Sequence, residues 1–282
     1  AGFIGHNLAL HLQSLGSKVD IIDGMQVNNL LSLVDNVDNL PYPDLSRAII
    51  NERTKLLKSA KINLRVQDAR DYHALTRLLN EIKPNIIIQL AAVSHANRSN
   101  KDPYSTFDHS FRTLENSLDW SRGGTSNVEQ FIFFSSSMVY GNFESDQVDE
   151  DTNCEPLGIY GALKYGSEKI IIGYNQTFGL PYTIIRPSAL YGERCISRRV
   201  GQIFIENSLM GKEIVMSDKG KEALDFTYIN DLVDGVTKSI GNKNAFNQVF
   251  NLTYGKACSI ADMAEIIKQY FPSIKVKNVE RD

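Results

Sequence analysis

The sequence has few cysteines, little net charge and no long hydrophobic run. Its 282 residues include three cysteines, far apart and odd in number: Cys154, Cys195 and Cys258. They fit neither a disulfide framework nor a metal-ligand spacing, so we expect no metal site and a reducing, cytoplasmic location. The net charge of −3 gives no basis for binding nucleic acid or an anionic membrane. No apolar run approaches the roughly 20 residues that span a bilayer, so we expect no membrane partner.

What the sequence does contain is a regular alternation of strand-like and helix-like segments. Strands are expected at residues 18–23, 63–66, 84–90, 130–134 and 182–187, and helices at residues 45–60, 72–82, 103–120 and 157–178. The strand at 84–90 is almost wholly apolar, as expected for a parallel strand covered on both faces. This order predicts an α/β fold with a doubly wound parallel sheet.

After Gly192 the alternation becomes less regular. A helix near residues 200–210, short strands near 214–215 and 249–250, and a helix beginning at Ser259 predict a smaller C-terminal lobe. Ser259 and Asp262 fit a capping box, which fixes the start of that last helix. We therefore expect residues 1–192 to form the main domain and residues 193–282 to form mainly the smaller lobe, with some segments returning to the main domain.

The first residues resemble the second half of a Gly-x-x-Gly-x-x-Gly dinucleotide-binding turn. Gly2 would let the backbone approach a pyrophosphate, and Gly5 would let helix and strand pack closely, with Phe3 and Ile4 between them. The strand that precedes this turn in the full pattern is not in the sequence, so we expect the sheet to lack its first strand. Asp23 ends the next strand, about 20 residues on, where a carboxylate holds the adenosine ribose of NAD and repels the extra phosphate of NADP.

Polar or small residues follow three other expected strands. Asp68 and Ala69 follow the strand at 63–66 and are placed to contact adenine. The small residues Ala91 and Ala92, with Ser94, follow the strand at 84–90 and would let a flat cofactor pass close to the backbone. Ser135-Ser136-Ser137 follows the strand at 130–134. Ligands bind outside the carboxyl ends of strands in open α/β sheets, so these positions predict a ligand site.

Tyr160 and Lys164 are four residues apart in an expected helix that Gly179 ends. This spacing places both side chains on one face of the helix. A free phenol has a pKa of roughly 10 and is a poor base at neutral pH. A nearby ammonium group lowers that pKa, so the pair predicts a tyrosine that exchanges protons. The pattern is degenerate, and a surface tyrosine and lysine at helical spacing would match it equally well.

Taken in order, these motifs resemble the extended short-chain dehydrogenase/reductase family, in particular its NAD-dependent sugar-nucleotide epimerases and dehydratases. The matching stretches cover nearly the whole chain: Gly2-Phe3-Ile4-Gly5, Asp23, Asp68, Leu90-Ala91-Ala92, Ser135-Ser136-Ser137-Met138-Val139-Tyr140-Gly141, Tyr160-Gly161-Ala162-Leu163-Lys164, Arg186-Pro187, Tyr191-Gly192 and Asp225-Phe226-Thr227-Tyr228-Ile229. Each motif is weak alone, but the ordered set is specific. The resemblance implies a Rossmann-type NAD-binding domain at 1–192 and a substrate-binding lobe at 193–282.

The resemblance also implies residue roles. Ser136 is the catalytic serine, Tyr160 is the acid/base, and Lys164 holds the nicotinamide ribose while lowering the pKa of the phenol. The implied NAD-binding residues are Gly2, Phe3, Ile4, Gly5, Asp23, Asp68, Ala69, Leu90, Ala91, Ala92, Ser94, Tyr160, Lys164 and Pro187. The implied substrate-binding residues include Ser94, Ser136 and Ser137.

The sequence departs from the family pattern at two positions that normally help to hold the diphosphate of a sugar nucleotide. Ala189 stands where the family often has Asn, and Leu224 stands where it often has Arg. Arg194, Arg198 or Arg199 would substitute for them, because guanidinium groups bind phosphate through two hydrogen bonds. Of these, we include Arg194 and Arg199 among the expected substrate-binding residues.

The expected function is NAD-dependent epimerisation at C4 of a UDP-linked hexose through a 4-keto intermediate, by a homodimer. A 4,6-dehydratase is disfavoured, because dehydratases of the family carry an Asp-Glu pair where this chain has Ser137 and Met138. A reductase or decarboxylase acting on a sugar nucleotide stays open. A non-catalytic NAD(H) sensor would be expected to have a broken catalytic set, whereas the set here is whole.

Overall fold

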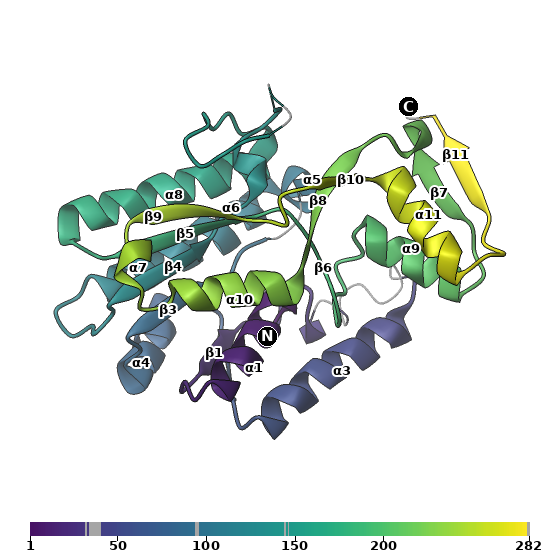
Figure 1. Ribbon diagram of the computed structural model, residues 1–282. Helices are drawn as coiled ribbons and strands as arrows, with labels where there is room; N and C mark the ends of the chain where they lie inside the picture. Colours follow the sequence, from purple (N-terminus) through teal and green to yellow (C-terminus); the bar gives the residue numbers. More distant parts are fainter. Residues whose placement is uncertain (32, 34–40, 94–95, 144, 146, 281–282) are drawn as a thin grey trace.

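The computed structural model describes residues 1–31, 33, 41–93, 96–143, 145 and 147–280 (Figure 1). Its strands are β1 (Asp20–Asp23), β2 (Asn63–Val66), β3 (Ile86–Gln89), β4 (Gln130–Phe134), β5 (Tyr182–Pro187), β6 (Ala189–Tyr191), β7 (Ile214–Ser217), β8 (Ala223–Tyr228), β9 (Gln248–Leu252), β10 (Ala257–Ser259) and β11 (Val276–Val279). Its α-helices are α1 (Phe3–Ser14), α3 (Pro43–Ser59), α4 (Tyr72–Ile82), α5 (Ala96–Lys101), α6 (Pro103–Phe107), α7 (Thr113–Ser121), α8 (Gly158–Phe178), α9 (Val200–Leu209), α10 (Ile229–Ser239) and α11 (Ile260–Tyr270).

The main sheet is parallel and is in two parts. Strands lie in the order β3-β4-β5-β9 in one part, and β1 pairs with β2 in the other. Parallel strands need a crossover between them, and helices supply it here. The predicted α/β fold is therefore confirmed.

The side chains of strand β4 show that both faces of the sheet are covered by helices. Its five residues are all buried, and successive side chains point to opposite faces. Ile132 and Phe134 pack in a cluster with residues of α1 and α10, whereas Phe131 and Phe133 pack with residues of α7 and α8. Helices therefore cover both faces of the sheet, as Figure 1 shows.

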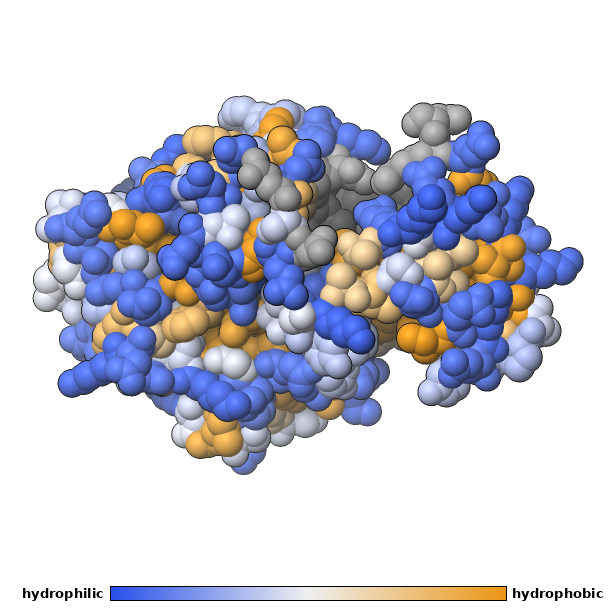
Figure 2. Space-filling model, turned by 45° about the horizontal axis from the view of Figure 1, so that its top comes forward, coloured by the Kyte–Doolittle hydropathy of each residue, from blue (hydrophilic) through white to orange (hydrophobic). Residues whose placement is uncertain are grey.

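The C-terminal part has a core of its own. Phe204 of α9, Ile214 of β7 and Ala264 of α11 are buried in one hydrophobic cluster. Strands β10, β8 and β6 form one small sheet, and β11 pairs with β7 in another. In the space-filling view, the surface is hollowed where this part meets the larger body (Figure 2).

Two sequence-based expectations differ from the structure. The short strand near residues 249–250 belongs to the main sheet, because β9 pairs with β5 and not with the C-terminal strands. The helix expected at 103–120 is interrupted by a π-helical turn at Asp108–Arg112 between α6 and α7. The expected helix starting at Ser259 is confirmed, with the Ser259 and Asp262 capping box in place.

No helix within the described ranges is long and apolar enough to span a membrane.

Candidate active site

The glycine turn opens helix α1. Gly2 is the N-cap residue and provides no side-chain cap, so the first amide groups of the helix point outward without one. Among the described residues, no atom lies within 4 Å of the point where a β-carbon on Gly2 would stand. A β-carbon on Gly5 would stand 3.4 Å from Leu90 Cδ1, so this glycine lets α1 approach the end of β3. An uncapped helix N-terminus beside open space fits the pyrophosphate of NAD.

Asp23 lies beside this turn at the end of β1. Its Oδ2 is 2.6 Å from the backbone nitrogen of Ala1, and its Oδ1 accepts a hydrogen bond of 2.6 Å from the amide of Met25. The carboxylate therefore lies close to the start of the glycine turn. A carboxylate at the end of β1 beside this turn suits a group that binds the adenosine ribose while the helix receives the pyrophosphate.

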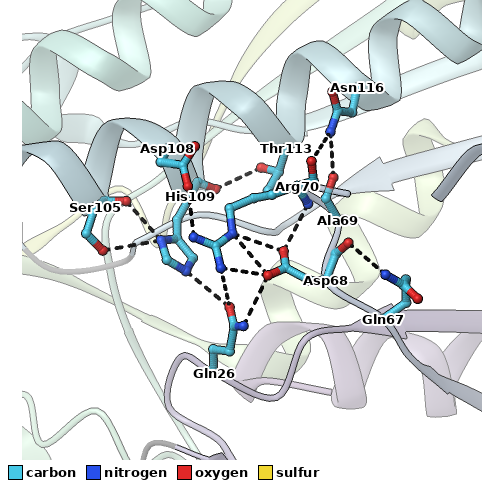
Figure 3. Close-up of polar contacts among 10 residues, drawn as sticks. All are labelled: Gln26, Gln67, Asp68, Ala69, Arg70, Ser105, Asp108, His109, Thr113 and Asn116. Carbon is cyan, nitrogen blue, oxygen red and sulfur yellow. Dashed lines mark hydrogen bonds and ion pairs between the residues drawn. The ribbon is translucent and has the colours of Figure 1, made fainter. Parts of the chain in front are cut away.

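Asp68 belongs to a polar network that Figure 3 shows. Arg70 Nη2 lies 2.6 Å from Asp68 Oδ2, and the Gln26 amide donates to the same oxygen at 3.1 Å. The hydrogen bonds from Arg70 are the main reason that the pKa of Asp68 is lowered to about 2. Arg70 also contacts Asp108 at 2.8 Å, and His109 lies 3.1 Å from Gln26 Oε1. The network ties the loops after β1 and β2 to the π-helical turn.

Side chains of α7 hold the main chain of the residue next to Asp68 and of the loop after β3. Asn116 donates to the carbonyl oxygen of Ala69 at 2.9 Å, and Thr113 donates to that of Ala91 at 3.2 Å. Leu90 packs against the cluster that contains α1, and Ala92 follows Ala91 in the loop. Ser94, a predicted cofactor and substrate residue, lies outside the described residues.

The carboxyl end of β4 delivers the serines. Ser136 is buried and caps a short 3-10 turn, where its Oγ accepts a hydrogen bond of 3.2 Å from the amide of Met138. Helix α8 begins against this turn: a β-carbon on Gly161 would stand only 2.7 Å from the Met138 carbonyl oxygen. The absence of that carbon lets the first turn of α8 approach closely, and Tyr160 is thereby brought near enough to Ser136 for this serine to affect the pKa of the phenol.

Lys164 is buried one helical turn after Tyr160. Its Nζ donates a hydrogen bond of 2.6 Å to the Phe134 carbonyl oxygen and lies 5.9 Å from the centre of the Tyr160 ring. Burial lowers the pKa of Lys164 to about 8, against an opposing effect of Glu168.

The prediction that Lys164 lowers the pKa of Tyr160 is wrong for this structure. Burial raises the pKa of the Tyr160 phenol, and the groups that oppose this rise are Ser136 and Arg199. The physical reason is that the Lys164 ammonium group is turned to the end of β4 and not to the phenol oxygen.

A buried ion pair lies behind the lysine. Arg186 of β5 makes two hydrogen bonds to Glu168 of α8, at 3.0 and 2.7 Å, and the two side chains are only 5% and 2% exposed. Arg186 also donates to the Tyr140 hydroxyl at 2.8 Å. Pro187, the next residue, ends β5 opposite Leu252 of β9. These contacts fix α8 against the sheet beneath the catalytic pair.

The predicted substrate residues are not all together. Ser137 follows Ser136 in the same turn, and Arg199 lies near enough to Tyr160 to affect its pKa. Arg194 instead turns toward α1, where its Nε lies 2.9 Å from His6 Nε2. Leu224, which replaces a family arginine, packs in the C-terminal core.

The sequence analysis did not single out three buried polar residues, His6, Arg53 and Glu168, and it gave no role to Arg186, which pairs with Glu168. Glu168 lies four residues after Lys164 on the same helix face, and Arg186 interrupts an apolar strand; these positions were the available signal. No such signal marked Arg53, whose helix pattern is that of a surface helix. In the part of the chain that is described, no group of acidic, histidine or cysteine side chains is arranged to hold a metal ion.

Comparison with known proteins agrees with this geometry. Residues 1–253 match the NAD dependent epimerase/dehydratase family. The chain is 28% identical to an uncharacterized UDP-glucose epimerase of Bacillus subtilis, covering 95% of this chain and 79% of that protein. It is 25% identical to a dTDP-D-glucose 4,6-dehydratase of Dictyostelium discoideum, covering 95% and 59% of the two chains.

Solved structures show the same fold. The crystal structure of UDP-glucuronic acid 4-epimerase from Bacillus cereus, in complex with UDP-glucuronic acid and NAD, superposes with a TM-score of 0.84 at 23% identity. The match covers 99% of this chain and 83% of that one. The chain belongs to the NAD-dependent epimerase/dehydratase family and is an NAD-dependent enzyme of the extended short-chain dehydrogenase/reductase type.

Proposed function

We propose that this enzyme epimerises a UDP-linked hexose at C4 through a 4-keto intermediate. The observation that carries the proposal is the meeting of Ser136 and Tyr160 above the buried Lys164, at the carboxyl end of β4. A serine hydroxyl and a phenol that lie near each other are suited to hold and exchange the proton of a sugar hydroxyl. The name of the Bacillus subtilis relative supports a UDP-hexose as substrate.

Each residue has a distinct role in the proposal. Tyr160 removes the proton from the C4 hydroxyl, and Ser136 holds that oxygen in hydrogen-bond reach. NAD, when bound, supplies the capacity to take up a hydride and return it. The glycine turn from Gly2 and the carboxylate of Asp23 hold the cofactor, with Phe3, Ile4, Gly5, Asp68, Ala69, Leu90, Ala91, Ala92, Ser94, Lys164 and Pro187 contributing to its site. Ser94, Ser137 and Arg199 are proposed to contact the substrate.

A dehydratase is the second candidate because the family and the Dictyostelium relative include that activity. Elimination of water needs an acid and a base beside the 4-keto sugar. Ser137 and Met138 stand where the family's dehydratases carry Asp and Glu, and neither side chain serves as an acid or base at neutral pH. This difference favours epimerisation.

We also propose a substrate lobe, a dimer and a cytoplasmic location. The lobe would comprise mainly residues 193–282, because α9, α11, β7 and β11 have a separate core. The dimer would pair α6–α7 and α8 with their mates, since Tyr104, Phe107 and Phe178 are exposed on these helices. All three cysteines are free thiols, which suits a reducing compartment.

The test is a panel of nucleotide sugars incubated with the enzyme and NAD. UDP-glucose, UDP-glucuronic acid and UDP-N-acetylglucosamine would each be resolved from their C4 epimers by chromatography. We expect one of them to reach an equilibrium mixture of epimers. Tyr160→Phe removes only the phenol oxygen, and should lower turnover by about 10²–10⁴-fold while NAD binding survives. A 4-keto-6-deoxy product would indicate the dehydratase instead.

A further inference from the structure

The loop between β6 and α9 carries an arginine that faces away from the catalytic pair. Arg194 has a positive φ of 63°, in the left-handed region that residues other than glycine adopt at a cost. Its side chain leaves the C-terminal part of the chain and reaches the first turn of α1. A non-glycine residue held in this conformation needs surrounding contacts that fix it.

The Arg194 guanidinium makes three contacts with the cofactor-binding half. Its Nε donates to His6 Nε2 at 2.9 Å, its Nη2 donates to Asn7 Oδ1 at 2.9 Å, and its Nη1 lies 3.5 Å from Glu52 Oε1. A guanidinium only donates hydrogen bonds. His6 Nε2 is therefore the unprotonated nitrogen, and His6 Nδ1 carries the proton that it donates to the Gly2 carbonyl oxygen at 2.9 Å.

His6 links the loop to the glycine turn itself. The ring is fully buried, and burial is the main reason that the pKa of His6 is lowered to about 3. The imidazole therefore stays neutral at physiological pH and keeps one acceptor and one donor. A continuous chain of hydrogen bonds thus runs from Arg194 through His6 to Gly2, the N-cap residue of α1.

Arg53 of α3 holds the same loop through its main chain. This side chain is only 1% exposed, and its Nε and Nη2 both donate to the Arg194 carbonyl oxygen, the former at 2.9 Å. Its Nη1 donates to the Asn28 carbonyl oxygen at 3.3 Å, in the loop that follows Asp23. Within the described ranges, no carboxylate forms an ion pair with Arg53, so this buried cation stands among backbone dipoles close to the cofactor site.

We propose that Arg194 is a positioning residue that fastens the β6–α9 loop to the start of α1 and so retains the bound dinucleotide. The contacts with His6 and Asn7 cross from the C-terminal half of the chain to the helix whose N-terminus receives the pyrophosphate. The dinucleotide leaves only when this fastening opens. The proposal rests on NAD binding at the glycine turn and does not depend on which sugar is the substrate.

Retention has a clear use in an enzyme that takes a hydride from its substrate and returns it. If the cofactor left between the two transfers, the ketone intermediate could not be reduced again. Hydrogen bonds from Arg194 that stay formed throughout each turnover would slow the exchange of cofactor without slowing the hydride transfers. Arg53 supports this role by holding the main chain of Arg194 while leaving its guanidinium directed at α1.

The test measures the dissociation rate of NADH, followed by the fall in its fluorescence when excess NAD displaces it. Arg194→Met keeps the length of the side chain and removes all three contacts, and should speed dissociation at least about tenfold. Arg198→Met is the matched control: Arg198 lies in the same loop, also has a positive φ of 47°, and pairs instead with Glu206 at 2.8 Å. We expect its rate to stay within about twofold of the native rate.

A double-variant cycle separates the contact from a general loosening of the loop. His6→Leu removes the acceptor and fills the space, and combining it with Arg194→Met should add less than the sum of the two single effects. If His6→Leu does not fold, Asn7→Leu takes its place in the cycle. A dissociation rate for folded Arg194→Met within twofold of the native protein, or equal acceleration by Arg198→Met, would overturn the proposal. No substrate is needed, so failure to epimerise the sugar panel leaves this result unaffected.

Discussion

The Lys164 ammonium nitrogen lies 2.6 Å from the carbonyl oxygen of Phe134, the last residue of β4, and donates a hydrogen bond to it. This bond joins helix α8 to the strand that delivers Ser136. The lysine therefore holds the two catalytic elements at a fixed distance before any ligand arrives. Burying an ammonium group to do so has an energetic cost, and its pKa of about 8 reports that cost.

The cost predicts a pH-dependent stability. Since the folded pKa of Lys164 is about 8, below its ordinary value, the unfolded chain binds more protons between these two pH values. The free energy of unfolding should therefore rise with pH from about 8 to about 10.5, relative to Lys164→Met, by about 3 kcal/mol. Urea unfolding of both proteins without cofactor, from about pH 7 to about pH 10, measures the difference. If the difference in unfolding free energy between the two proteins stays constant with pH, the pKa of Lys164 is not lowered by burial in the folded protein.

Gly161 offers a sharper test of how Tyr160 is placed. A β-carbon there would stand 2.7 Å from the Met138 carbonyl oxygen and 3.1 Å from Pro156 Cβ, so Gly161→Ala must push the first turn of α8 away from Ser136. Displacements of about 1 Å at a reacting group cost about 10²-fold in rate, and we expect turnover to fall by that order while NAD binding persists.

Gly173→Ala is the control for this substitution. Among the described residues nothing lies within 4 Å of a β-carbon at Gly173, which is in the same helix. That variant should keep native turnover. Native turnover in Gly161→Ala would mean that the close contact with Met138 does not position the tyrosine.

Asp23 should decide which dinucleotide binds. Asp23→Asn keeps the shape and the hydrogen bond from Met25 but removes the negative charge that repels a 2′-phosphate. We expect the preference for NAD over NADP to shrink by at least about tenfold, measured by calorimetric titration of both cofactors. Asp20→Asn, on the same strand, removes a charge that pairs with Arg65 and should leave the preference unchanged. Tighter binding of NADP than NAD by the native protein would contradict the role of Asp23.

The proposed dimer makes a prediction about surface aromatics. Phe107 is 52% exposed and stacks on Phe111 beside the α8 face, where a partner would cover it. Phe107→Glu should convert a dimer into a monomer by light scattering at micromolar concentration, because it places a charge in an apolar interface. Tyr270→Glu, on the exposed face of α11, should not change the mass. A native protein that is strictly monomeric under these conditions would rule out the dimer.

The sequence allowed the elements of the main sheet to be predicted because local signals agreed with the fold. The strand at 130–134 and the helix ending at Gly179 have apolar patterns and a stop signal that tertiary contacts reinforce. The position of β9 was missed because its strand pattern carries no information about its partner, and the residues of β5 that pair with it lie 65 positions earlier in the chain.

The residues of the candidate site could be predicted from the sequence, but the directions in which their side chains point could not. Spacing placed Tyr160 and Lys164 on one helix face, yet the direction of the Lys164 ammonium depends on the β4 carbonyl beneath it, which no local pattern encodes. Arg194 was expected near a substrate diphosphate, whereas contacts with His6 and Asn7, almost 190 residues earlier, turn it toward α1. Long-range polar contacts of this kind require the fold before they can be inferred.

The most direct test of the proposed chemistry follows the hydrogen at C4. The nucleotide sugar that the panel identifies would be prepared with deuterium at C4 and incubated with the enzyme in ordinary water. If the hydrogen leaves C4 as a hydride and returns to the other face within one closed site, the epimer keeps its deuterium, as mass spectrometry and proton NMR would show. Loss of deuterium to solvent hydrogen at C4 during epimerisation would contradict the account.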